Sequence, residues 1–157
     1  MKIEVRNVKI WKCVTSGVTP CFRASVVLDD EPSGRVRNDG LVSANRYAPR
    51  WLGERLEAYA RSLPPLDCWG GRVAQTADLL IDRAVQAFLV AEAYRKLAKT
   101  HVVYLSATGE LRHGSPLPRD RVYLAARSRA GRPGVLRVLN LLPEEQALAI
   151  LREKVRA

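Results

Sequence analysis

The residues best suited to chemistry lie in the last third of the chain. Between residues 101 and 142, arginine side chains are opposed only by Glu110 and Asp120. Guanidinium groups contact phosphates, and an interleaved tyrosine ring can stack on an unpaired base. A period of two over 121–129 predicts a strand with one cationic face. We therefore expect an arginine-rich β-ribbon that binds nucleic acid, built from Arg119, Arg121, Tyr123, Arg127, Arg129, Arg132 and Arg137. A solvated surface is the alternative.

Two further surfaces combine cations with aromatic rings. Arg46 and Tyr47 precede a predicted helix, and Trp11 lies beside Lys9 and Lys12 at the end of the first predicted strand. Such interleaving suits single strands, whose unstacked bases offer flat faces. The same side chains also suit a protein core. We expect Tyr47, which precedes its helix, to be exposed.

The chain has two histidines, His101 and His113. A hairpin closing at Thr108 and Gly109 would bring them close together, as general acid and base of a metal-independent ribonuclease. A structural histidine next to the end of a helix is the more common arrangement. The sequence therefore leans toward a non-enzymatic protein, with a nuclease or other phosphoryl hydrolase as the alternative.

An acidic turn at Asp29, Asp30 and Glu31 is the other candidate for catalysis. Clustered carboxylates hold Mg²⁺ in nucleases. Neighbouring residues of an extended strand point to opposite faces, however, and turns favour Asp for backbone reasons. No phosphate-loop, zinc-deaminase or metal-ligand spacing occurs, so we expect no cofactor and no metal.

The charge of the chain indicates its class of partner. Its 157 residues carry a formal net charge of +10, with a pI near 10.1. A protein this basic is attracted to nucleic acid. We favour single-stranded DNA or RNA over duplex, because no segment has the pattern of a helix-turn-helix reader. A structural subunit that binds an acidic protein partner is the alternative, and a homodimer is compatible with either.

Composition also indicates the compartment and source. No apolar run reaches the roughly 18 residues of a membrane span, and the start lacks a signal-peptide pattern, so we expect a cytoplasmic protein with no membrane partner. Four Asn, three Gln and one Met are few, which favours a thermophilic archaeal source. The excess of arginine over lysine can equally reflect a GC-rich genome. Cys13, Cys21 and Cys68 are expected to be buried thiols, or Cys13 and Cys21 to be linked, as in hyperthermophiles.

The order of predicted elements indicates an α+β fold with a single domain, residues 1–157. An antiparallel sheet of about five or six strands in two blocks is expected to be covered by three helices. Phase slippage in the first strand predicts a bulge near Asn7. Apolar spacing predicts a long central helix in the core, and places Trp51 on the buried side of the helix before it. The predicted elements are strands within 1–42, helices 49–63 and 72–99, strands within 101–140 and a C-terminal helix 143–156.

Overall fold

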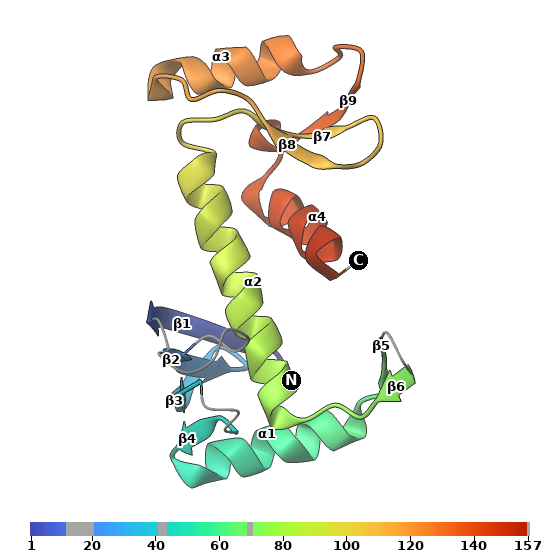
Figure 1. Ribbon diagram of the computed structural model, residues 1–157. Coiled ribbons are helices and arrows are strands. Elements are labelled where there is room, and N and C mark those ends of the chain that lie inside the picture. Colours follow the sequence, from blue (N-terminus) through green and yellow to red (C-terminus); the bar gives the residue numbers. More distant parts are fainter. Residues whose placement is uncertain (12–20, 41–43, 69–70, 157) are drawn as a thin grey trace. The chain divides into compact units, whose positions relative to one another are not determined.

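A computed structural model describes residues 1–11, 21–40, 44–68 and 71–156 (Figure 1). The protein has an α+β fold, as predicted, with four α-helices and antiparallel sheets in the described part of the chain. No helix in these ranges is long and apolar enough to cross a membrane. The chain divides into two compact units, Met1–Phe88 and Leu89–Ala157, and each is described by itself. The single domain stays a prediction.

A four-stranded antiparallel sheet forms the first part of unit 1. Its order is β1-β2-β3-β4, with β1 at Ile3–Trp11, β2 at Cys21–Leu28, β3 at Glu31–Asn38 and β4 at Arg46–Ala48. The predicted bulge in β1 is confirmed, because the register of β1 against β2 shifts between Arg6 and Lys9, and Asn7 has a φ of 53°.

One face of this sheet is apolar and contributes to the core. Phe22, Val26 and Val36 are almost completely buried. Helix α1, Arg50–Ser62, lies next to β4 (Figure 1) and buries Leu52 and Leu56, together with Ala60, at four-residue steps. The prediction that Trp51 is buried is wrong: its side chain is 46% exposed, because the helix turns it away from the Leu52 stripe.

A short hairpin separates α1 from the long helix. Strands β5, Leu66–Cys68, and β6, Gly71–Val73, pair antiparallel. Helix α2 then runs from Ala77 to Leu97, so the prediction of a start at residue 72 is wrong. The helix begins later because Thr76 caps it: its hydroxyl accepts a hydrogen bond from the Leu79 amide at 3.2 Å.

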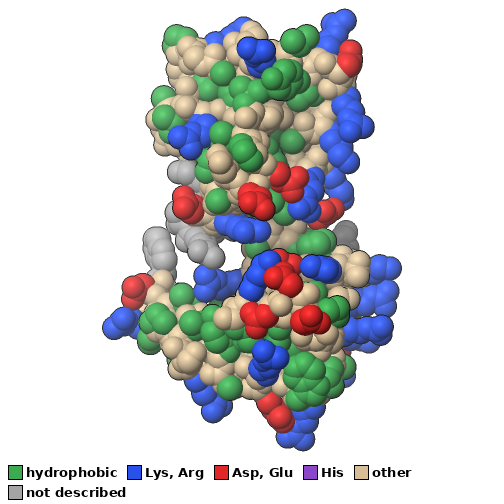
Figure 2. Space-filling view, turned by 180° about the vertical axis from the view of Figure 1, so that it is seen from behind, with side chains coloured by type: hydrophobic (Ala, Val, Ile, Leu, Met, Phe, Trp, Pro, Cys, Tyr) green, Lys and Arg blue, Asp and Glu red, His purple; other side chains and the backbone are tan. Residues whose placement is uncertain are grey.

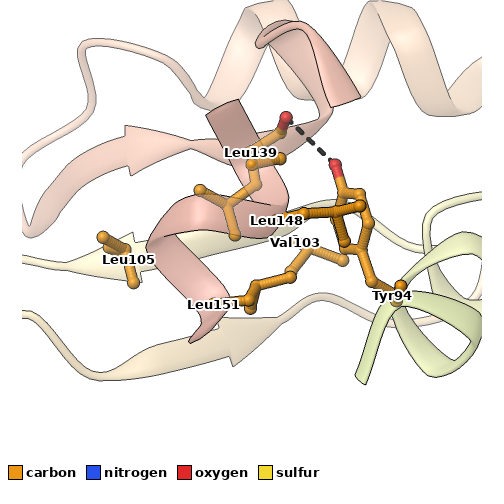
Figure 3. Close-up of a cluster of buried hydrophobic side chains, with 8 residues drawn as sticks. Tyr94, Val103, Leu105, Leu139, Leu148 and Leu151 are labelled. Carbon is orange, nitrogen blue, oxygen red and sulfur yellow. Dashed lines mark hydrogen bonds between the residues drawn. The ribbon is translucent and has the colours of Figure 1, made fainter. Parts of the chain in front are cut away.

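Unit 2 contains a three-stranded antiparallel sheet of order β8-β7-β9, a short 3₁₀ helix η1 (Leu139–Leu141) and helix α4 (Glu144–Arg156). The strands are β7, Val103–Ser106; β8, Leu111–His113; and β9, Val135–Val138. Its larger apolar cluster includes Val103, Leu148 and Leu151 (Figure 3). The Tyr94 hydroxyl donates a hydrogen bond to the Leu139 carbonyl at 3.1 Å, which ties α2 to this cluster.

The predicted strand 121–129 is instead helix α3, Arg119–Arg129. The pattern was ambiguous because Val122 and Ala126, four residues apart, are buried in either structure. Leu124 distinguishes the strand from the helix. A strand would bury Leu124 with its neighbours at even positions, whereas the helix leaves it 67% exposed. Strand β9 consequently pairs with β7, and the arginine-rich β-ribbon does not form.

Candidate nucleic-acid interface

A row of four cations crosses the sheet of unit 1. Lys9 of β1 pairs with Arg23 of β2, Arg23 with Arg37 of β3, and Arg37 with Arg46 of β4. Residues directly opposite each other in a sheet point to the same face. Since neighbouring strands are about 4.8 Å apart, the row extends for about 14 Å across the strands.

The bulge in β1 brings more side chains to this cationic face. Arg6 pairs with Ser25, and Ser25 with Arg35, so a second row runs beside the first. In a regular strand, Arg6 and Lys9 would lie on opposite faces, because they are three residues apart. The extra residue at the bulge returns both to one side.

The cationic face is hollowed. A depression of about 510 Å³ is lined by five cations together with Asn7, Ser25 and further residues of β2, β3 and β4. Figure 2 shows Lys and Arg side chains gathered along one side of the part that contains the four-stranded sheet. We call this surface the cationic sheet face and define it by Lys9, Arg23, Arg35, Arg37, Arg46 and Trp11.

Several of these cations lack acidic neighbours. Lys9, Arg23 and Arg35 form no ion pair with any residue that the structure describes. Arg37 is paired with Asp39, and Arg46 lies 3.7 Å from the same carboxylate. One carboxylate thus lies beside two cations at one end of the row, and Arg6 of the second row is paired with Glu4 at 3.3 Å. Lys9, Arg23 and Arg35 keep a positive charge that no described carboxylate pairs.

Trp11 supplies an aromatic ring to the same face. It pairs with Cys21, two residues before Arg23, and its side chain is 37% exposed. The Arg37 guanidinium lies 5.7 Å from the centre of the indole ring, within the range of a cation–π contact. The sequence-predicted residues Trp11 and Arg46 therefore lie on the same face of the sheet, but on its two opposite edge strands. Lys12 lies outside the described residues.

Tyr47 belongs to the opposite face, and the prediction that it is exposed is wrong. Its hydroxyl donates a 2.7 Å hydrogen bond to Asp78 of α2, and its ring is half-buried against Gly53. Burial, together with the Asp78 carboxylate, raises the pKa of Tyr47 far above its usual range. Asn45 joins the same network by donating its backbone amide to Asp78 and its side-chain amide to Asp82. Tyr47 is thus a structural residue.

The arginines predicted to form a ribbon are distributed over several surfaces of unit 2. Along α3, Arg119, Tyr123 and Arg127 follow one flank at four-residue steps, about 6 Å apart, and Arg121 faces another direction. The exposed fraction of Tyr123 is 58%. The remaining members are also separated: Arg129 lies over the Tyr104 ring at 4.7 Å, Arg132 binds Ser128, and Arg137 is exposed on β9.

A second hollow, of about 520 Å³, opens beside that flank of α3. Lys99, Arg119 and Tyr123 line it together with Arg95 and Glu144. Arg95 is bound to Glu144 at 2.8 Å and to Glu92 at 3.0 Å, so its charge is balanced. Lys99 and Arg119 have no acidic partner among the described residues, and they leave the hollow of unit 2 weakly cationic.

The two histidines do come together. His101 follows α2, His113 ends β8, and the hairpin between β7 and β8 places their ring centres 5.2 Å apart at an interplanar angle of 90°. The Nδ1 atom of His101 lies 2.8 Å from the Thr100 hydroxyl, and that of His113 lies 3.0 Å from the Gly114 carbonyl. The predicted proximity is confirmed.

The acidic turn is occupied by structural contacts. Asp29 and Asp30 both have positive φ angles in the turn between β2 and β3. Lys2 lies 2.8 Å from Asp30 and lowers the pKa of that carboxyl, and Arg55 lies 3.6 Å from Asp29. Across the described ranges, no three His, Cys, Asp or Glu side chains are grouped so that they could hold a metal ion.

The cysteines are only partly described. Cys21 is buried and disulfide-bonded. Cys13 lies outside the described residues, so the link between these two residues stays a prediction.

Sequence reasoning missed most of the cationic sheet face. It predicted the strand around Arg35 and Arg37 but assigned no role to these residues or to Arg23. Each strand carries only one or two of the cations, and the row appears only when three pairing registers are combined. The alternation of arginine with buried residues in β3, Arg35, Val36, Arg37, was the available signal.

Comparison of the chain with protein families, curated proteins and solved structures finds no match.

Proposed function

We propose that the protein binds single-stranded nucleic acid, DNA or RNA, on the cationic sheet face of unit 1. One observation carries the proposal. Lys9, Arg23, Arg37 and Arg46 form a register-matched row, and its first two members make no ion pair with any described residue. Unopposed cations release counterions from a phosphate chain and so favour polyanion binding.

A single strand suits this surface better than a duplex. The row crosses the strands of a sheet, where a flexible phosphate chain can follow the cations. Trp11 at one end offers a partly exposed ring on which a base can stack. No helix of the described chain combines an arginine-rich exposed flank with the preceding turn and helix of a major-groove reader.

The decisive experiment removes charge from the face without changing the fold. Arg23→Ala with Arg35→Ala takes away two exposed cations that make no ion pair in the described structure. We expect single-strand affinity to fall about tenfold or more at moderate salt, because each phosphate contact contributes to the electrostatic part of binding. Fluorescence anisotropy of labelled single-stranded DNA, single-stranded RNA and duplex DNA measures this.

A matched control is available on α1. Arg50→Ala with Arg61→Ala removes the same net charge from two exposed residues that are paired with Glu54 and Glu57. This control should bind almost as the wild type does. Equal losses of single-strand affinity in the two double variants would show that binding depends only on net charge. The cationic sheet face would then be rejected as the binding site. Failure of the wild type to bind any probe at low salt would redirect the search to an acidic protein partner.

A further inference from the structure

We propose that His101 and His113 act as an acid–base pair that cleaves single-stranded RNA by internal transesterification. The inference rests on the proposed function for its substrate class and adds an activity to binding. Its basis is the contact between the two rings, 5.2 Å apart, in a chain whose only histidines are these two. Imidazole is the side chain best suited to give and accept protons near neutral pH.

The backbone holds the two rings together. In the ladder between β7 and β8, His113 pairs with Val103. Val103 follows His101 by two residues. The Gly114 amide extends the ladder with a 2.9 Å hydrogen bond to the Val102 carbonyl. Apolar packing does not require the pair, because His113 is exposed and neither histidine belongs to the buried clusters described for unit 2.

The hydrogen-bond partners of the two rings differ, so the two rings suit different roles. A carbonyl oxygen only accepts, so the Nδ1 of His113, 3.0 Å from the Gly114 carbonyl, carries a proton. The Nε2 of neutral His113 then has a free lone pair and is suited to act as a base. The Thr100 hydroxyl can donate or accept, so His101 is compatible with the protonated form that a general acid needs.

The reaction needs no component beyond the RNA and these side chains. The Nε2 of His113 takes the proton of a ribose 2′-hydroxyl, and the 2′-oxygen attacks the adjacent phosphorus. A P–O2′ bond forms, the P–O5′ bond breaks, and protonated His101 gives its proton to the leaving 5′-oxygen. The products are a 2′,3′-cyclic phosphate and a free 5′-hydroxyl, and DNA cannot react because it lacks the nucleophile.

Cations lie close to the same turn. Asn140, which lines the hollow of unit 2, donates a hydrogen bond to the His101 carbonyl at 3.0 Å. Lys99 and Arg119 line that hollow too, and neither is ion-paired with a described residue. Positive charge at this position would attract the phosphate and stabilise the negative charge that develops on it during the reaction.

The test uses a labelled, mixed-sequence single-stranded RNA, an excess of the whole protein and EDTA. We expect shortened products with 2′,3′-cyclic phosphate ends. His101→Ala and His113→Ala should each slow cleavage by about 100-fold or more, the usual contribution of a general acid or base. The all-deoxy strand should stay intact while it is bound. His101→Gln or His113→Gln provides a second variant if alanine impairs folding, which a changed circular dichroism spectrum would reveal.

Three results would overturn the inference: intact RNA with the wild type, cleavage that persists in either histidine variant, or cleavage that requires a divalent metal. The two proposals fail separately. DNA binding with intact RNA would leave the sheet-face proposal standing alone. RNA cleavage together with unchanged binding by the Arg23→Ala, Arg35→Ala protein would leave only the histidine pair.

Discussion

At the scale of single residues, Tyr47 shows how one aromatic side chain can be taken for a binding residue. It lies beside Arg46 in the sequence, yet the two point to opposite faces of the sheet because they are neighbours on β4. Arg46 faces the cationic row, whereas the Tyr47 hydroxyl is hydrogen-bonded to Asp78. A cation directly next to an aromatic residue on a strand therefore does not indicate a joint surface.

This buried phenol should affect stability at alkaline pH. The folded-state pKa of Tyr47 is raised above the unfolded value of about 10. Its contribution to stability is thus present below about pH 10 and is lost as the pH rises further. Tyr47→Phe should lower the free energy of unfolding at pH 7 by about 1.5 kcal/mol, measured by urea denaturation.

The same variant has an internal control. The phenolate absorbance that folded protein develops near pH 10 should be equal in Tyr47→Phe and wild type, because Tyr47 is still protonated there. If the absorbance of the variant fell by the contribution of one of the five tyrosines, Tyr47 would be ionised near pH 10 and its raised pKa would be contradicted.

At the scale of elements, close contact between β4 and α1 depends on a missing side chain. A Cβ atom built on Gly53 of α1 would lie 2.8 Å from Cδ2 and 3.0 Å from Cγ of Tyr47. These atoms are near the base of the ring and cannot move aside easily. Alanine in a helix interior gains about 1 kcal/mol over glycine, whereas overpacking costs about 1–3 kcal/mol.

We therefore expect Gly53→Ala to destabilise the protein by about 1 kcal/mol despite its better helix propensity. Introducing it into a Tyr47→Ala background should reverse the sign, because the ring that it meets is gone. Thermal denaturation of the four proteins of this double-mutant cycle measures both effects. Stabilisation by Gly53→Ala alone would show that Tyr47 adapts freely.

The elements differ in how well they could be predicted from the sequence alone. Local signals were sufficient for the Asn7 bulge, α1 and the β7–β8 hairpin, because each is encoded in one short continuous segment. The order of the predicted elements was sufficient for the α+β class. Helix α3 was missed although Pro118 precedes it and Asp120 lies in its first turn, both signals of a helix start. The row of cations could not be read locally, since it depends on the register between four strands.

At the scale of the whole molecule, the net charge of +10 supports nucleic-acid binding less strongly than the distribution of that charge does. Most arginines of unit 2 are dispersed or occupied by local contacts, and the cationic sheet face concentrates charge that little else neutralises. The number of cations in its hollow therefore sets a limit on the electrostatic part of binding.

Salt titration can count these contacts. For a single strand, log K falls by about 0.7 per log unit of salt for each phosphate contact. Lys9, Arg23, Arg35, Arg37 and Arg46 line the hollow, so we expect a slope of about −3.5. Arg23→Ala with Arg35→Ala should reduce its magnitude by about 1.4, and the α1 double variant should leave it unchanged. An unaltered slope in the first variant would place the phosphates elsewhere.

The bulge at Asn7 separates the shape of the cationic sheet face from its charge, two properties that usually change together. A chain without Asn7 would alternate regularly from Glu4 through Arg6 and Lys9 to Trp11, and every cation of β1 would stay on its present side. What the extra residue contributes is curvature, since a bulge bends and twists its strand. A one-residue deletion would thus flatten the surface and preserve its charge, so the contribution of shape to recognition can be separated from that of electrostatics.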